Sequence, residues 1–227
     1  MLYGVRFDGV RMASGRVASV RLSECELTRY ELDGADVDDV RLTLCQAGRL
    51  VTTNCALRDV ALLGGNYGIL ELQAGTMSNV SVAEAKLGAL HLVGVDQAVR
   101  FRVNSSRLES LGLEACSITD LYLWDSHITR LAITKGNYRG WITKCTLGAG
   151  RVEDATFAAS FWDESEVNDV TFSGVTFERF LCARDARFVR MRLSSPRYTP
   201  GFELVADGAS FEQSDRFEDS APRGEQP

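Results

Sequence analysis

Histidine, proline and long hydrophobic runs are all scarce in this sequence of 227 residues, which contains two histidines and four prolines. No apolar run approaches the roughly 20 residues that a helix needs to span a bilayer, so we expect no membrane segment. The first eight residues lack a basic start followed by an apolar stretch, so no secretory signal is expected and a cytoplasmic location is predicted. The net charge of −6 weighs against nucleic-acid binding, which needs concentrated lysine and arginine.

Hydrophobic residues recur at every fifth position. Of the 20 positions reached by steps of five from Leu2 to Gln97, 18 are hydrophobic, about twice the number expected from a hydrophobic content of 45%. Neither an α-helix nor a single strand produces a five-residue period. The period slips once before Val103 and again, by a one-residue deletion, between Tyr138 and Ile142. It continues to Leu193, which indicates one continuous repeat structure.

A second inward position precedes each of these by two residues, and its size alternates. Small residues stand at Cys25, Ala35 and Cys45, and bulky ones stand between them at Tyr30 and Val40. Alternating small and large side chains fill a narrow tube without voids. The sequence therefore predicts that each five-residue unit buries two residues and exposes three.

These units resemble the pentapeptide-repeat family, whose pattern is a small residue, any residue, Leu or Phe, and two polar residues. The matching units include Cys25-Glu26-Leu27, Ala35-Asp36-Val37, Cys116-Ser117-Ile118, Cys145-Thr146-Leu147, Ala155-Thr156-Phe157 and Val170-Thr171-Phe172. The resemblance covers residues 1–194 and implies an all-β fold: a right-handed, four-sided β-helix solenoid with about 20 residues per coil and about ten coils.

Charge placement agrees with a coil of that length. Twenty residues after the arginines of the first coil, three of four positions carry an acid; the three pairs are Arg6 with Glu26, Arg11 with Glu31, and Arg16 with Asp36. We interpret them as surface pairs between neighbouring rungs.

Residues that could carry chemistry do not converge in this register. His91 and His127 fall on outward positions of different sides, whereas a metal site or a catalytic pair needs groups within a few ångströms. Five of the six cysteines occupy the small inward position, and no CxxC pair occurs, so we interpret them as buried hydrophobic residues. We therefore expect no catalytic residues, no metal site and no cofactor.

Two related Gly-Asn-Tyr segments occur in the repeat, at Gly65-Asn66-Tyr67 and Gly136-Asn137-Tyr138. The first lies in a glycine-rich stretch but lacks the Gly-Lys-Ser/Thr ending of a phosphate-binding loop. Bulge or turn geometry is the expected explanation of both segments.

One outward column is unusually apolar. It comprises Tyr122, Trp141, Phe161 and Leu181, with Trp124 on the same strand as the first of them. Exposed apolar patches and aromatic clusters mark binding surfaces, so these five residues form the candidate interaction surface. The alternative is that the C-terminal segment Pro200–Val205 folds back over the column.

The C-terminal region departs from the repeat. Pro196 follows two serines and ends the regular solenoid, so we expect residues 1–194 to form the β-helix. Residues 195–212 are expected to form a capping or covering segment, and residues 213–227 a polar, disordered tail.

These features favour a non-enzymatic scaffold that binds another protein. The partner could be a second copy of the chain, which would give a homodimer. The alternative comes from the family resemblance, because some pentapeptide-repeat proteins mimic DNA, bind DNA gyrase and inhibit or protect it. An acidic stretch from Glu153 to Asp169 holds six carboxylates and no Lys or Arg. Duplex DNA carries about one charge per 1.7 Å, so a rod of ~45 Å would need roughly 26 charges, and the net charge of −6 falls far short.

Overall fold

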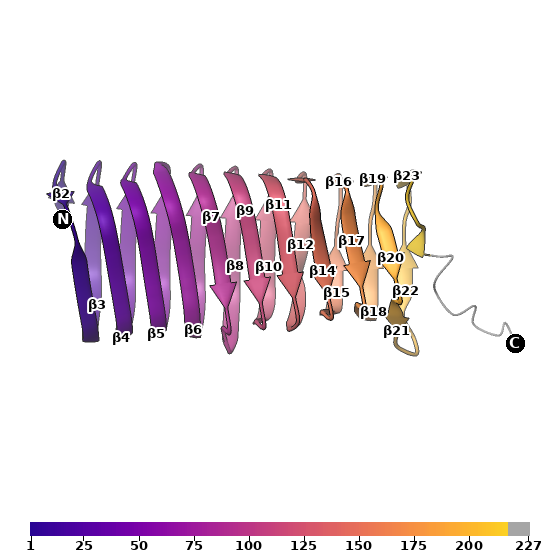
Figure 1. Cartoon of the computed structure of the whole chain (residues 1–227), viewed down its shortest axis with the longest axis horizontal. Helices are drawn as coiled ribbons and strands as arrows, with labels where there is room; N and C mark the ends of the chain where they lie inside the picture. The colour runs from indigo at the N-terminus through magenta and orange to yellow at the C-terminus, as the bar shows by residue number, and fades with distance from the viewer. Residues whose placement is uncertain (218–227) are drawn as a thin grey trace, which may run out of the picture.

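The computed structural model describes residues 1–217, which form a parallel β-solenoid of about ten coils. Strands of successive coils stack side by side along the long axis, with the N-terminus at one end and the C-terminal coils at the other (Figure 1). Every strand pair is parallel and belongs to one continuous ladder. The all-β solenoid predicted from the repeat is confirmed. No helix within these residues is long and apolar enough to cross a membrane.

The strands shorten from the N-terminal to the C-terminal half of the solenoid. The first group is β1 (Leu2–Tyr3), β2 (Arg6–Phe7), β3 (Val10–Ser23), β4 (Glu26–Thr43), β5 (Gln46–Leu63) and β6 (Asn66–Ala83). The middle group is β7 (Lys86–Val93), β8 (Gln97–Asn104), β9 (Arg107–Glu114), β10 (Ser117–Trp124), β11 (His127–Thr134) and β12 (Asn137–Thr143). The last group is β13 (Thr146–Leu147), β14 (Gly150–Glu153), β15 (Thr156–Phe161), β16 (Glu166–Asn168), β17 (Val170–Ser173), β18 (Thr176–Cys182), β19 (Arg187–Val189), β20 (Arg192–Ser194), β21 (Arg197–Tyr198), β22 (Glu203–Val205) and β23 (Ser210–Glu212).

Residues 20 positions apart lie on neighbouring rungs through the first four coils, as Arg11 and Glu31 do. The offset becomes 21 where Met77 pairs with Ala98, and 19 where Leu121 pairs with Gly140. Both slips were predicted from the sequence. The prediction placed Gln97 inside, however, and this was wrong: the extra residue precedes Gln97, so Gln97 is exposed and Ala98 is buried.

Each coil turns through corners that require a left-handed backbone. Residues with positive φ recur about every ten positions, for example Glu24, Gly34, Leu44, Asn54 and Gly64. In the middle coils, an eight-residue strand such as β9 and the two corner residues that follow it together make two five-residue units. The backbone period thus follows directly from the sequence period.

The two Gly-Asn-Tyr segments have a packing explanation. Tyr67 and Tyr138 occupy inward positions, and both are buried. A Cβ atom on Gly136 would overlap the Cys116 carbonyl oxygen and lie 3.0 Å from the Tyr138 hydroxyl oxygen. Glycine at this position, with a φ of 87°, therefore leaves space both for the neighbouring rung and for the larger tyrosine ring.

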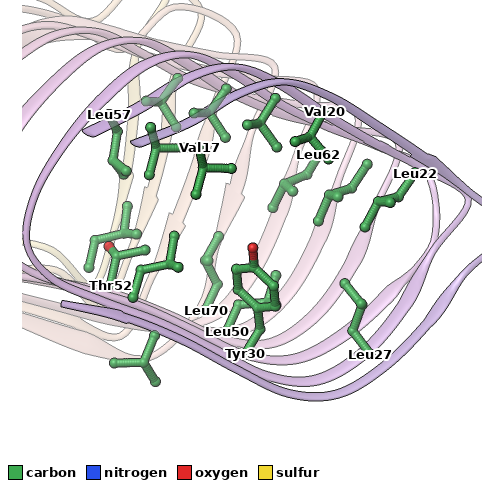
Figure 2. Close-up of a pocket in the computed structure, with 18 residues that line it drawn as sticks. Val17, Val20, Leu22, Leu27, Tyr30, Leu50, Thr52, Leu57, Leu62 and Leu70 are labelled. Atoms are coloured by element: carbon green, nitrogen blue, oxygen red, sulfur yellow. The ribbon is translucent and has the colours of Figure 1, made fainter. Parts of the chain in front are cut away.

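The interior is hollow at one end and filled at the other. The first four coils enclose a cavity of about 90 Å³ that we name the N-terminal bore; Figure 2 shows its apolar lining. From Val103 to Leu113, the inward side chains are almost fully buried. The C-terminal end is closed by an aromatic cluster in which the Phe217 ring meets the rings of Phe177 and Phe188 edge-on.

The charge columns follow the predicted register, but most ion pairs do not run straight down them. Arg6 and Glu26 lie 3.8 Å apart. Arg16 instead contacts Asp38, at 3.2 Å, although its rung partner is Asp36. A long arginine side chain can contact a carboxylate two residues beyond its rung partner, so register alone does not select the partner.

Residues 195–212 continue the solenoid as an irregular final turn. β22 pairs with β18, and β23 pairs with β19. Residues 213–217, which we expected to belong to a disordered tail, pack against the last coil instead: the Ser214 hydroxyl accepts a hydrogen bond from the Met191 amide at 2.8 Å, and Phe217 is buried. The correction arises because the polar run at 213–216 supplies hydrogen bonds to the last coil. Residues 218–227 of that predicted tail lie outside the described residues.

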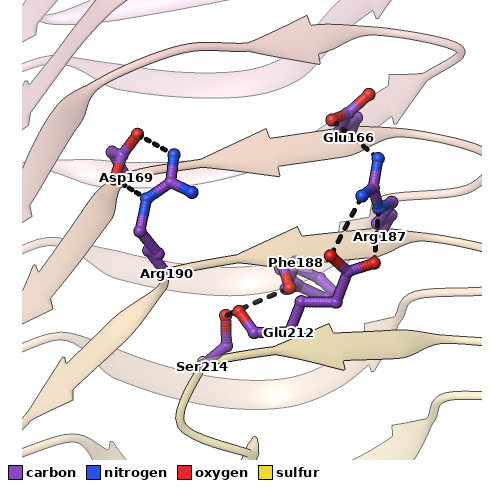
Figure 3. A network of polar contacts seen from close by, with 7 residues as sticks. All are labelled: Glu166, Asp169, Arg187, Phe188, Arg190, Glu212 and Ser214. Atoms are coloured by element: carbon purple, nitrogen blue, oxygen red, sulfur yellow. Dashed lines mark hydrogen bonds and ion pairs between the residues drawn. The ribbon is translucent and has the colours of Figure 1, made fainter.

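Three ion pairs, made by two arginines, link the last coils (Figure 3). Arg187 contacts Glu212 at 2.8 Å and Glu166 at 3.3 Å, and Arg190 contacts Asp169 at 2.5 Å. Hydrogen bonding to Arg187 lowers the pKa of Glu212, and hydrogen bonding to Arg190 lowers the pKa of Asp169. These contacts therefore favour the charged carboxylates at neutral pH.

Acidification is expected to loosen the final turn. A carboxyl group whose pKa is lower in the folded than in the unfolded chain stabilises the fold above its unfolded pKa, and this stabilisation is lost as the pH falls through the folded value. Amide hydrogen exchange in β23, corrected for intrinsic rates, should therefore lose protection below roughly pH 4. An Arg187→Gln variant should show a smaller pH dependence. Equal pH dependence in both proteins would contradict this role of the ion pair.

Candidate interaction surface

The aromatic column comprises Tyr122 on β10, Trp141 on β12 and Phe161 on β15. Their rungs are consecutive: Tyr122 pairs with Trp141, and Trp141 pairs with Phe161. The Tyr122 and Trp141 ring centroids lie 4.7 Å apart, and those of Trp141 and Phe161 lie 5.3 Å apart, with nearly parallel planes. All three side chains are half-buried. The rings cover one another, and their edges remain on the outer face of the sheet.

Two local features build this stack. The one-residue slip in β12 brings Trp141 beside Tyr122, with Gly140 beside Leu121. Gly140 is required there, because a Cβ atom would overlap the Leu121 carbonyl oxygen. On the preceding rung, the guanidinium of Arg102 lies 5.6 Å from the centre of the Tyr122 ring, within the range of a cation–π contact.

Trp124 lies two residues along β10 from Tyr122, on the same face of the sheet. Its side chain is 56% exposed, far more than the half-buried rings of the column. The sheet face thus combines a stack of aromatic edges with one large indole that projects into solvent. Trp124 and the three stacked residues lie together as the sequence predicted.

Leu181 does not belong to this surface, and that prediction was wrong. The ladder between β15 and β18 shifts after Phe157, so Leu181 pairs with Ser160 and Cys182 pairs with Phe161. Leu181 consequently points inward and is 1% exposed. A single extra residue moves a side chain to the opposite face of a strand.

The C-terminal segment does not fold back over the aromatic column within residues 1–217. Residues 203–205 form β22, which pairs with β18 as the next rung, with Leu204 beside Leu181. The segment lengthens the sheet beyond Phe161 instead of lying across it. The exposure of Trp124 agrees with this arrangement.

The residues considered for chemistry remain apart. The His91 Nε2 lies 3.4 Å from the Ser110 hydroxyl, whereas His127 pairs with Arg107 on another column. All six cysteines are free and buried, and burial raises the pKa of Cys145 to about 11, which disfavours a thiolate. In residues 1–217, no group of three His, Cys, Asp or Glu residues is placed to hold a metal ion.

The acidic stretch between residues 153 and 169 is largely paired with cations. Four of its carboxylates form ion pairs, which are Glu153 with Arg151, Glu164 with Lys144, Glu166 with Arg187, and Asp169 with Arg190. The cations lie just outside the stretch in sequence or on neighbouring rungs. The cluster that looks acidic in the sequence is therefore neutralised in part on the folded surface.

Arg102 and the N-terminal bore were missed by the sequence analysis. Arg102 occupies the same outward column as Tyr122, 20 residues earlier, so extending that column backward would have found it. The sequence also contained an indication of the bore, because small valine side chains stand at four successive positions of one inward column: Val20, Val40, Val60 and Val80.

Stacking makes Trp141 a structural residue and leaves Trp124 free for contacts outside the fold. Each aromatic pair contributes about 0.5–1.5 kcal/mol beyond area burial, so Trp141→Ala should lower the free energy of unfolding by about 2–3 kcal/mol. Trp124→Ala should change it by less than about 1 kcal/mol. Urea denaturation of both variants measures the difference, and equal losses would contradict the stacked arrangement.

Comparison with known proteins finds only weak structural similarity and no similar sequence. No family model matches the chain, and no curated protein sequence matches it. The solved structure of HetL, a pentapeptide repeat protein involved in heterocyst differentiation regulation from the cyanobacterium Nostoc sp., aligns with a TM-score of 0.36 and 16% identity, over 86% of this chain and 90% of that one. QnrB1, a plasmid-mediated fluoroquinolone resistance protein, aligns with a TM-score of 0.28 and 10% identity, over 91% and 96%.

Both TM-scores lie below 0.5, so neither likeness carries weight for fold or function. The fold is instead defined by features of the chain itself. Inward side chains recur every five residues, rungs lie 19 to 21 residues apart through most of the solenoid, and the strands of residues 1–217 pair in parallel. These features define a parallel β-solenoid built on a five-residue repeat.

Proposed function

We propose that this chain is a non-enzymatic scaffold that binds another protein through the sheet face carrying the aromatic column and Trp124. The observation that supports this most directly is the large exposed indole of Trp124 beside three stacked rings. Tryptophan and tyrosine at the centre of a patch supply most of the binding energy in many interfaces. A rigid ladder also holds these groups in place before binding, which reduces the entropy lost on association.

The DNA-mimic alternative, binding of DNA gyrase, has less support. It needs a face of unpaired negative charge, whereas four carboxylates of the acidic stretch are paired with cations. No observation in residues 1–217 favours it over the aromatic face. If the purified chain neither inhibits gyrase supercoiling nor protects it, this alternative is excluded.

Site-specific photocrosslinking tests the proposal. A photoreactive phenylalanine analogue replaces Trp124 in one protein and Arg130, which is exposed on β11 of the other face, in the control. In the native cells, the analogue at position 124 should capture a discrete partner that the analogue at 130 does not. A product of twice the chain mass would identify a second copy as that partner.

A second substitution separates specific capture from chance contact. Thr143→Arg places a charged side chain on the rung next to Trp124 and should abolish the product formed at position 124. Thr129→Arg, at an exposed position on β11, should leave it unchanged. Absence of any product at 124, or an equal yield at 130, would contradict binding through this face.

A further inference from the structure

The N-terminal bore is a cavity that the proposed scaffold function does not use. Its volume is about 90 Å³, and its lining comes from four successive coils, from Val17 in the first to Val80 in the fourth. Three steps between rungs of about 4.8 Å each make it roughly 14 Å long. It is therefore elongated along the solenoid axis and narrow across it.

One inward column explains why this part of the tube is hollow. Valine occupies positions 20, 40, 60 and 80, and the next residue in the column is Phe101, which pairs with Val80. Val40 and Val60 point inward yet stay partly accessible, whereas Phe101 is 0% exposed. The short valine side chains leave space along the axis, and Phe101 fills that space at the fifth coil.

The bore is reached from the N-terminal end of the solenoid. The inward side chains of the first coil, Phe7, Met12 and Val17, pack against the core but remain partly exposed. The opposite end of the bore is blocked by the filled coils that begin at Phe101. A ligand would thus enter along the axis and stop at a fixed depth.

The lining is almost entirely aliphatic, with two hydroxyl groups. Figure 2 shows the Tyr30 ring extending into the bore with its oxygen toward the middle, and Thr52 at the wall. Neither hydroxyl makes a hydrogen bond with another residue in the described part of the chain. Apolar cavities of this kind hold water poorly and take up apolar molecules instead.

We propose that the N-terminal bore binds a small molecule with a short, unbranched aliphatic chain, which enters end-on and places its polar group within reach of Tyr30 or Thr52. The cavity volume of about 90 Å³ is spread over four coils, so the bore is too narrow in cross-section for a six-membered ring. The length along the axis suits a straight chain. This site is independent of the proposed scaffold function, because the aromatic column lies on the outside of later coils.

Titration with 1-hexanol and cyclohexanol tests the shape requirement. With 1-hexanol, the methyl NMR signals of Val40 and Val60 should shift saturably, and the melting temperature should rise. Cyclohexanol should produce neither effect at the same concentration. Equal responses to both alcohols, or shifts that do not saturate, would overturn the proposal.

A variant that fills part of the bore, with a matched control outside it, tests the location of the site. Val60→Leu occupies part of the cavity, so it should weaken 1-hexanol binding by at least ~tenfold while the ligand-free protein melts at the same or a higher temperature. Val103→Leu, in the filled part of the core, should bind 1-hexanol as the unmodified chain does. Unchanged binding by Val60→Leu would place the ligand elsewhere and refute the site.

Discussion

Replacing Phe101 by alanine is expected to lower the free energy of unfolding by about 3–5 kcal/mol. The Phe101 side chain is fully buried between Val80 on one rung and Leu121 on the next. Alanine would remove the ring contacts and leave a void that the rigid ladder cannot close. The cost of such a substitution rises with the volume of the void that remains.

Urea denaturation followed by circular dichroism measures this loss. Phe101→Leu keeps most of the apolar volume and should cost less than about 1.5 kcal/mol. A loss below about 1 kcal/mol for Phe101→Ala would show that the fifth coil is not filled as described. Phe101→Ala should also lengthen the bore, so the longest straight-chain alcohol that binds saturably should increase.

Replacing Gly140 by alanine is expected to cost at least about 2 kcal/mol, because overpacking costs about 1–3 kcal/mol and stacking of the aromatic column is disturbed as well. The added Cβ atom would overlap the Leu121 carbonyl oxygen on the adjoining rung. That oxygen is backbone, so relief requires the rungs to separate. Separation occurs beside Trp141, whose ring stacks on Tyr122.

Gly9→Ala is the matched control for this substitution. A Cβ atom on Gly9 meets no atom within 4 Å, and Gly9 does not have a positive φ. Alanine there should be neutral or slightly stabilising, because it restricts the unfolded chain. Thermal denaturation of both variants, with tryptophan fluorescence as the probe of the column, gives the comparison. Equal stability of the two variants would contradict the close rung contact at Gly140.

The coil architecture could be predicted from the sequence because burial and sequence share one period. Every five-residue unit places its central residue inside, so the hydrophobic pattern reports the coil directly. Errors arose where one residue is added, at Gln97 and at Leu181. An insertion in a solenoid keeps the coil and changes only the face on which a side chain lies, and a hydrophobic residue such as Leu181 is compatible with either face.

The candidate surface was predicted in part for the same reason. Tyr122, Trp141 and Phe161 could be aligned because the deletion between Tyr138 and Ile142 is visible in the pattern. The stacking of their rings, by which each ring partly buries the next, could not be predicted, because it depends on side-chain orientation. The C-terminal segment was expected to cap or cover the fold, but hydrophobicity alone does not distinguish a covering strand from another rung.

The proposed interaction surface requires that Tyr122, Trp141 and Phe161 occupy consecutive rungs of one outer face. Nuclear Overhauser effects between selectively labelled aromatic rings test this directly. The structure predicts cross-peaks between the rings of Tyr122 and Trp141 and between those of Trp141 and Phe161, with none from Trp141 to the inward ring of Phe101. Cross-peaks from Trp141 to Phe101, or absence of the Tyr122 contact, would contradict the register and remove the proposed interaction surface.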